Sequence, residues 1–495
     1  MHNRKNFISS LVNQIVHTLS GLIIPRLMIA SFGSEVNGLV TSIGQFLSFI
    51  SLLEGGLGAV VLAELYKPIE DGDKDKIKKI LIACQKFFTQ LSVWFVVYTI
   101  ILTIVYSLSV KESYSISFTS SLIIILAWTT VAQYLFSITQ RLYLQATQKL
   151  YIVNNVGTIS MIGSILLTII MLKLFPEIRL MKLVASLLFF LQPFIYNHYV
   201  GKEVNIKGYL KTPNDRSVLR NRWSGFAQNL SHFINVNTDV MLITFFSTFA
   251  NVSVYTVHLM AANAIRNVLV SIISSYQSAL GKYIAQNRID VLRERFFRFT
   301  NAIWAVCIVL FCTCLQLINP FVTLYTKGVN DANYYQPLFA LIIVLATFIY
   351  CIREPFRFLI LAAGKFKETN FGSIMEAALN IIISVVLVNI YGLVGVAIGT
   401  FVAISYRMIY FMLFLKKNIL HVRLREYLPH LAKMIVIIGV NIIAYYTVKI
   451  QITSIVSFVI HGILIVVIES IISGVFFLGI KESMNTITYI FNRTR

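Results

Sequence analysis

Charged residues are scarce in this chain, and acidic ones are the scarcer kind. Only 13% of the 495 residues are charged, with 21 Asp and Glu against 42 Lys and Arg. A soluble domain usually carries about 25% charged residues. With 57% hydrophobic residues, the chain has more apolar surface than a soluble core of this length can bury. Soluble, disordered and collagen-like classes are therefore excluded, and an all-α polytopic membrane protein remains.

Cysteine is also rare, and its placement indicates neither a disulfide framework nor a metal site. All five cysteines lie in apolar segments: Cys84, Cys307, Cys312, Cys314 and Cys351. The close pair Cys312 and Cys314 lacks the second ligand pair that a structural zinc site needs. We interpret the five as small buried hydrophobic residues and expect no metal and no cofactor.

Several functional signatures are missing. No Gly-rich phosphate loop follows a strand, so an ATPase is not expected. No large polar region exists to hold reacting groups, so we do not expect an enzyme. The net charge is +21, but no basic segment alternates with exposed aromatic residues as in proteins that bind single-stranded nucleic acid. We therefore expect no nucleic acid as a partner. Excess Lys and Arg are typical of the cytoplasmic loops of membrane proteins.

Long apolar runs fill most of the chain. A spanning helix needs about 20 apolar residues, and lipid cannot satisfy an open backbone, so these runs predict helices and not strands. We expect about 14 spans on this criterion, at residues 7–31, 38–65, 80–108, 118–146, 151–173, 180–200, 223–247, 253–280, 298–318, 336–363, 371–391, 393–415, 431–448 and 453–477.

Basic residues gather in alternate loops. If the spans are right, one side of the membrane holds about 30 Lys and Arg and the other about 6, which makes the first side cytoplasmic. Both termini are then cytoplasmic. The basic loops contain Lys67 to Lys79, Lys202 to Arg222, Lys282 to Arg298, and Lys416 to Arg425.

The chain also repeats itself at an offset of about 215 residues. Residues 141–149 (RLYLQATQK) resemble residues 357–365 (RFLILAAGK), and each segment leads into a similar helix start. The copies lie six spans apart and so share one orientation, which is typical of transporters with parallel repeats. We expect an N-lobe at 1–200, a basic cytoplasmic linker at 201–222, a C-lobe at 223–415, and an added helix pair with a cytoplasmic tail at 416–495.

Motifs in a fixed order resemble a known family. They are FGSEVNG at 32–38, LLEGGLG at 52–58, LYKP at 65–68, NTD at 237–239, AAGKFK at 362–367, and GLVGVAIGT at 392–400. The chain resembles the bacterial polysaccharide (O-antigen or capsule repeat-unit) flippases of the multidrug/oligosaccharidyl-lipid/polysaccharide exporter superfamily. The resemblance covers most of residues 20–415.

The resemblance implies two six-helix lobes around a central cavity and alternating access. It implies a bacterial cytoplasmic (inner) membrane protein that moves undecaprenyl-diphosphate-linked oligosaccharide to the outer leaflet for surface polysaccharide synthesis. Membrane lipids, a polysaccharide polymerase and glycosyltransferases are the implied partners. A drug antiporter of the same superfamily is the main alternative, although a cation pump should concentrate acids in its spans. A membrane-embedded polymerase is a further alternative, but such an enzyme should carry a long extracytoplasmic loop.

Charges inside the spans are the candidate substrate site. Each costs about 2.5–3.5 kcal/mol on insertion scales and needs a reason. Guanidinium groups suit a diphosphate because they donate paired hydrogen bonds to it. Lys86 and Arg407 lie near cytoplasmic ends, where long side chains reach the interface. The candidate diphosphate or cavity ligands are Arg26, Arg141, Arg266, Arg353 and Arg357.

Structural ion pairs compete with that interpretation. By depth in the membrane, Asp239 can meet Arg266, and Glu376 can meet Arg357. For Arg353 we favour the cavity. Glu54 and Asp239 are the candidates for ion coupling, since a buried carboxyl can exchange protons. Simple helix packing is the alternative for Glu54, and capping or interhelical hydrogen bonds are the alternative for Asp239.

Overall fold

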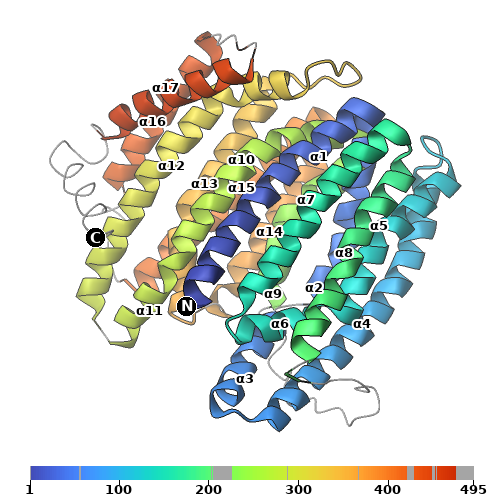
Figure 1. Ribbon diagram of the computed structural model, residues 1–495. Coiled ribbons are helices and arrows are strands. Elements are labelled where there is room, and N and C mark those ends of the chain that lie inside the picture. The colour runs from blue at the N-terminus through green and yellow to red at the C-terminus, as the bar shows by residue number, and fades with distance from the viewer. Residues whose placement is uncertain are drawn as a thin grey trace. The chain divides into compact units, whose positions relative to one another are not determined.

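The computed structural model describes residues 2–54, 57–201, 203–204, 226–286, 288–365, 367–420, 428–448, 452 and 454–474. Every regular element in this part of the chain is helical (Figure 1). The predicted linker lies almost wholly outside the described residues, as does the predicted C-terminal tail. The chain divides into two compact units, Met1–Phe233 (unit 1) and Ile234–Arg495 (unit 2).

Unit 1 contains the first eight helices. They are α1 (His2–Leu47), α2 (Ser51–Glu54), α3 (Leu57–Asp71), α4 (Lys74–Ser109), α5 (Ile116–Phe136), α6 (Ile138–Ala146), α7 (Leu150–Leu174) and α8 (Ile178–Gly201), with the short 3-10 helix η1 (Ser48–Ile50) before α2. Helix α7 packs against α1 and α8, and α5 packs against α4 and α8. Side-chain oxygens of Asp73 and Ser115 cap α4 and α5, as expected at helix starts.

Unit 2 contains the larger part of α9 (Phe226–Phe246) and the helices that follow it. They are α10 (Phe249–Ser275), α11 (Gln277–Ala285), α12 (Ile289–Tyr325), α13 (Pro337–Ala362), α14 (Asn370–Tyr391), α15 (Leu393–Asn418), α16 (Leu428–Thr447) and α17 (Ile455–Ser473), with the 3-10 helix η4 (Lys367–Thr369) before α14. Helix α15 packs on α13 and α14, while α16 and α17 pack on α12.

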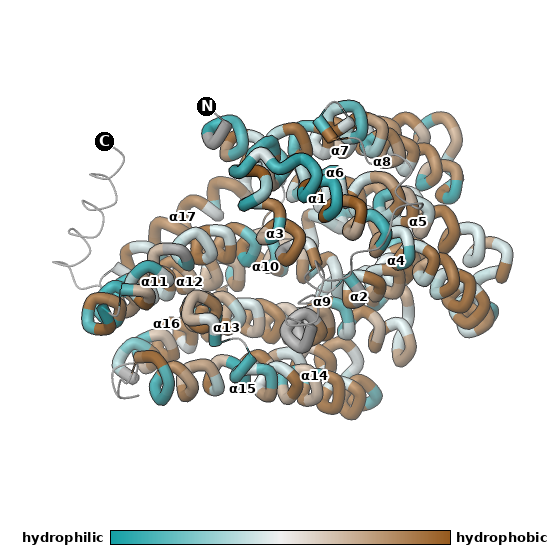
Figure 2. The backbone as a smooth tube through the Cα atoms, turned by 90° about the horizontal axis from the view of Figure 1, so that it is seen from below, coloured by the Kyte–Doolittle hydropathy of each residue, from teal (hydrophilic) through white to brown (hydrophobic). Residues whose placement is uncertain are grey.

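Twelve of the described helices are long and apolar enough to cross a membrane, against the 14 spans predicted. The first of these, Arg4–Ile50, covers the predicted span 7–31 and part of the span 38–65. It is bent at Gly33, whose φ of 83° and ψ of 170° are not helical. A shorter apolar helix, Val236–Phe246, lies within the predicted seventh span. Large apolar side chains stay exposed along the helices, and Figure 2 shows hydrophobic residues along α5 and α14. The chain is a polytopic all-α membrane protein.

The sequence repeat ends in the same turn in both copies. Gln148 and Gly364 both adopt a left-handed backbone, with φ of 60° and 68°. In each copy the following amide donates to a carbonyl five residues earlier: Lys149 to Leu144 at 2.7 Å, and Lys365 to Ile360 at 3.1 Å. This is a helix-ending hydrogen-bond pattern. The two segments predicted to repeat, 141–149 and 357–365, therefore end in the same kind of turn.

Two glycines explain the tight contact between α14 and α15. A Cβ added at Gly395 would lie 2.2 Å from the Leu387 carbonyl oxygen, and one at Gly399 would lie 2.1 Å from the Ser384 hydroxyl. Real Cβ atoms do not approach so closely, so only glycine lets these helices meet. This contact places Thr400 next to the polar residues of α14.

Candidate functional site

Four of the predicted spans carry a group of charges, which we call the α13 charge cluster: Arg266, Arg353, Glu354, Arg357, Glu376 and Arg407. Helix α13 supplies Arg353, Glu354 and Arg357 on adjacent turns. Helices α10, α14 and α15 supply Arg266, Glu376 and Arg407. The cluster therefore contains four guanidinium groups and two carboxylates, all in unit 2.

Arg353 is fully enclosed. Its Nη1 donates to Glu376 Oε1, and its Nε lies 3.9 Å from Glu354 Oε1. That Nε and Glu354 Oε1 are buried without a hydrogen-bond partner among the described residues. We expected Arg353 to line a cavity, with a Glu376–Arg357 pair as an alternative for Arg357. In the structure Glu376 pairs with Arg353, and Glu354 pairs with Arg357.

Arg357 and Arg266 are the more accessible cations of the cluster. Arg357 Nη2 lies 2.7 Å from Glu354 Oε2, yet 32% of its side chain stays exposed. Arg266 is half-buried, and its guanidinium carbon lies 5.3 Å from the centre of the Tyr350 ring. Arg353 approaches the same ring at 4.5 Å. Tyr350 thus holds two of the predicted arginines together through its negative face.

The expectation for Arg407 is wrong. This side chain was expected to reach the membrane surface, but only 2% of it is exposed. Its Nε lies 3.5 Å from Glu376 Oε2, and its two terminal nitrogens donate to the Thr369 carbonyl at 3.1 Å and the Ser373 hydroxyl at 2.5 Å. Glu376 therefore serves two arginines, and burying Arg407 is offset by these bonds.

Asp239 lies in a separate group of oxygens, the Asp239 cluster. Its Oδ2 accepts hydrogen bonds from Tyr255 at 2.6 Å and from Thr400 at 2.7 Å. Asn380 donates to the same Thr400 hydroxyl at 2.9 Å. Asp239 Oδ1 and Asn380 Oδ1 are buried, and no partner for them is present among the described residues. The alternative in which Asp239 pairs with Arg266 does not hold, because the Asp239 carboxylate accepts hydrogen bonds from the hydroxyl groups of Tyr255 and Thr400 instead.

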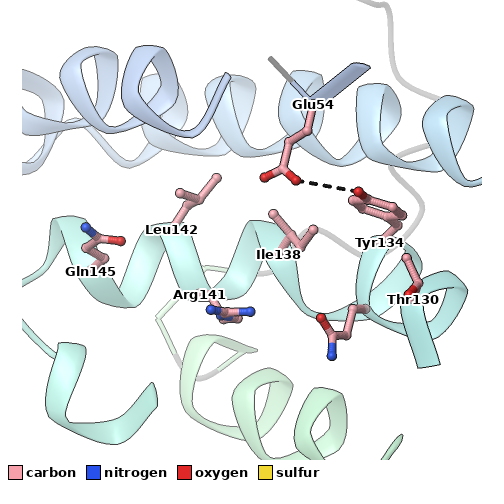
Figure 3. A pocket seen from close by; sticks show the side chains of 8 residues that line it. Glu54, Thr130, Tyr134, Ile138, Arg141, Leu142 and Gln145 are labelled. Carbon is pink, nitrogen blue, oxygen red and sulfur yellow. Dashed lines mark hydrogen bonds between the residues drawn. The ribbon is translucent and has the colours of Figure 1, made fainter. Parts of the chain in front are cut away.

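Unit 1 holds a cavity of about 230 Å³, which we call the α6 pocket. It brings together two residues singled out by the sequence, Glu54 and Arg141 (Figure 3). The Tyr134 hydroxyl donates to Glu54 Oε2 at 3.5 Å. No described carboxylate lies at ion-pair distance from Arg141. The remaining lining residues are Thr130, Gln133, Ile138, Leu142 and Gln145.

Some functional residues were missed by sequence reasoning. Glu354 and Arg357 stand three residues apart on one helix, which is a spacing that predicts an ion pair. Tyr255 and Thr400 lie on different helices, and only the fold brings them to Asp239. Arg26 is the remaining predicted arginine; it lies half-buried in α1 of unit 1.

Comparison with solved structures reveals clear relatives in fold. "Lipid II flippase MurJ, inward closed conformation" matches with a TM-score of 0.69 and 16% identity, covering 95% of this chain and 98% of that one. The MATE multidrug transporter DinF-BH matches with a TM-score of 0.63 and 15% identity, covering 85% and 96%. An inward-facing MATE family transporter of the MOP superfamily matches at 0.59 and 13%, covering 84% and 94%.

Neither a family model nor a curated protein matches the sequence. The structural neighbours are transporters and not enzymes. At these identities the likeness establishes the fold. This chain has the fold of the MOP superfamily transporters.

Proposed function

We propose that this chain is a flippase that moves an undecaprenyl-diphosphate-linked oligosaccharide to the outer leaflet of a bacterial cytoplasmic membrane by alternating access. The observation that carries the proposal is the surplus of arginine over carboxylate in the α13 charge cluster. A cation surplus inside a membrane is costly, and a bound diphosphate would neutralise it through paired hydrogen bonds.

Arg266 and Arg357 are the proposed diphosphate ligands. Both keep exposed surface, whereas Arg353 and Arg407 are enclosed with Glu376. We therefore give Arg353 the role of positioning Glu376 and Tyr350, in place of direct contact. Arg26 and Arg141 were candidate diphosphate or cavity ligands. Because they belong to unit 1, we propose them instead as contacts for the saccharide part of the substrate.

The extent of the structural match also supports a lipid-linked substrate. The match to the lipid II flippase covers 95% of this chain, whereas the matches to the multidrug transporters cover 84–85%. Drug antiport is the alternative function, but a cationic drug would be repelled by the arginine surplus. A polymerase function for this chain is disfavoured because the structural neighbours are transporters. A separate polysaccharide polymerase and glycosyltransferases are instead proposed as partners of the flippase.

The Asp239 cluster is the proposed coupling site. A single buried carboxylate among neutral oxygens matches the charge of one monovalent cation, H⁺ or Na⁺. The free Oδ1 of Asp239 and Oδ1 of Asn380 are acceptors that such a cation would satisfy. We prefer Asp239 to Glu54 for this role because Asp239 is enclosed, whereas Glu54 lines an open pocket.

Binding of undecaprenyl diphosphate to purified protein in nanodiscs tests the substrate. Arg266→Gln should weaken binding about tenfold or more, since a charged hydrogen bond contributes about 1.5–3 kcal/mol. This variant leaves no carboxylate unpaired, because the described contact of Arg266 is the Tyr350 ring. Arg298→Gln on the exposed end of α12 is the matched control. Equal binding by both variants would contradict the assignment.

Coupling is tested by imposing either a sodium or a proton gradient on proteoliposomes. Asp239→Asn keeps the size of the side chain and removes the charge. We expect it to abolish the response to the gradient while retaining carrier-lipid binding. A gradient response that survives in Asp239→Asn would move coupling away from this site.

A further inference from the structure

The α6 pocket lies where a helical path is interrupted. Helix α5 ends at Phe136 and α6 begins at Ile138, with Ser137 between them at φ −121° and ψ −44°. Glu54 of α2 lines the pocket together with residues of α5 and α6. Interrupted helices within a membrane are tolerated where they line a cavity, and transporters build substrate sites from them.

The lining of the pocket combines both kinds of hydrogen-bonding group. The Glu54 carboxylate accepts, the Arg141 guanidinium donates, and the amides of Gln133 and Gln145 do both. Glu54 and Arg141 together carry no net charge, so the pocket gives little overall attraction to an anion or to a cation. A neutral ligand with several hydroxyl groups uses both side chains, because its hydroxyls donate to Glu54 and accept from Arg141.

The size of the pocket and its apolar lining limit the choice of ligand further. Drug-sized sites occupy about 300–1,000 Å³, and this cavity of about 230 Å³ is smaller. It has room for one ring and not for a chain of rings. Ile138 and Leu142 add an apolar wall, against which the C–H face of a sugar ring can pack.

We infer that the α6 pocket binds one neutral sugar ring, of the hexose or N-acetylhexosamine type. Glu54 and Arg141 hold its hydroxyl groups from different elements, and the glutamines complete the set. Assigning that ring to the carrier-linked oligosaccharide rests on the proposed function. The claim that the pocket binds a sugar ring does not rest on the proposed function. The binding claim and the assignment of the ring to the carrier-linked oligosaccharide can therefore fail separately.

The test uses free monosaccharides and saturation-transfer NMR on the full chain in nanodiscs. The probes are glucose, galactose, N-acetylglucosamine and N-acetylgalactosamine. At least one should bind the unmodified protein, and Arg141→Ala and Glu54→Ala should each weaken it about tenfold, as expected for a lost charged hydrogen bond. Arg298→Ala and Glu294→Ala, at an exposed ion pair, are the matched controls and should bind normally.

A variant that fills the pocket tests sugar binding in a protein that should remain folded. Gln145 is exposed, so Gln145→Trp should fold normally and fill the pocket, and it should also abolish sugar binding. If no sugar binds, or if binding survives in Gln145→Trp, the inference is overturned. The binding of undecaprenyl diphosphate without sugar is a separate measurement, so the proposed function is still tested independently of the sugar pocket. Uptake of the free sugar into proteoliposomes would instead show that the pocket serves a free sugar and would overturn its assignment to the carrier-linked group.

Discussion

At the residue scale, the molecule handles intramembrane charge by sharing carboxylates. Glu376 lies between Arg353 and Arg407, and Glu354 lies between Arg353 and Arg357. Buried charges that remain paired avoid most of the cost of desolvation, but removing one partner exposes that cost. The arrangement therefore gives the enclosed arginines a structural role and leaves Arg266 and Arg357, the proposed diphosphate ligands, more accessible.

Arg353→Ala should lower the stability of the protein. We expect a loss of about 3 kcal/mol in unfolding free energy, at the low end for a broken buried pair because Arg407 still neutralises Glu376. Thermal unfolding of the purified protein measures this. The exposed pair of Arg298 with Glu294 supplies the control, where Arg298→Ala should cost under about 1 kcal/mol. Equal losses in the two variants would show that Arg353 is not structural.

The sequence predicted which residues are charged at depth, but only part of their pairing. Depth along a helix follows from residue number, so Glu376 was correctly expected to meet an arginine of α13. Which arginine it meets depends on helix rotation, which depth does not determine. The same limit explains Asp239, whose partners Tyr255 and Thr400 come from helices that only tertiary packing brings together.

At the scale of elements, most spans were predicted and several of their bounds were not. Long apolar runs determine where a helix crosses, but they do not show where two runs join into one helix or where one run is divided. The break at Ser137 divides the predicted span 118–146 and creates the α6 pocket, yet no Pro or Gly stands at that position. The other copy of the repeat continues without a break as α13, with Pro355 inside the helix.

The shared turn of the repeat provides a paired test of backbone strain. Gln148 holds a left-handed backbone at φ 60°, where the other copy has Gly364. Such a conformation costs a non-glycine residue about 1–2 kcal/mol. Gln148→Gly should therefore raise the unfolding temperature, and Gly364→Ala should lower it. The hydrogen bond that the Asn6 amide donates to the main-chain carbonyl of residue 148 does not depend on the side chain there. Shifts of the same sign in both variants would rule out strain as the cause.

At the scale of the whole molecule, the fold is that of a superfamily with several substrates, so the fold alone does not choose among them. The choice depends on sites, namely the arginine surplus of unit 2 and the α6 pocket of unit 1. One residue of each site was predicted from the sequence, because Arg141 and Arg357 begin the two copies of the repeat and were candidate ligands.

Orientation in the membrane is a prediction at this scale. The Lys and Arg bias places both termini on the cytoplasmic side. Within unit 1, Asn6 bonds to the α6–α7 turn, which sets the N-terminal segment and this turn at the same end of the unit (Figure 1). Reporter fusions after Lys111 and Lys327 should be active outside the cytoplasm, and fusions within the turn at Gly72 should be active inside. A cytoplasmic signal after Lys111 would overturn the order of spans.

The central claim is tested most directly by following a fluorescent undecaprenyl-diphosphate-linked saccharide in proteoliposomes, with a membrane-impermeant quencher reporting which leaflet it occupies. We predict that the purified chain speeds exchange between leaflets at least about tenfold over protein-free vesicles. Arg266→Gln should lower that rate about tenfold, whereas Arg298→Gln should not. Exchange at the protein-free rate, in vesicles where the protein is shown to be folded, would contradict it.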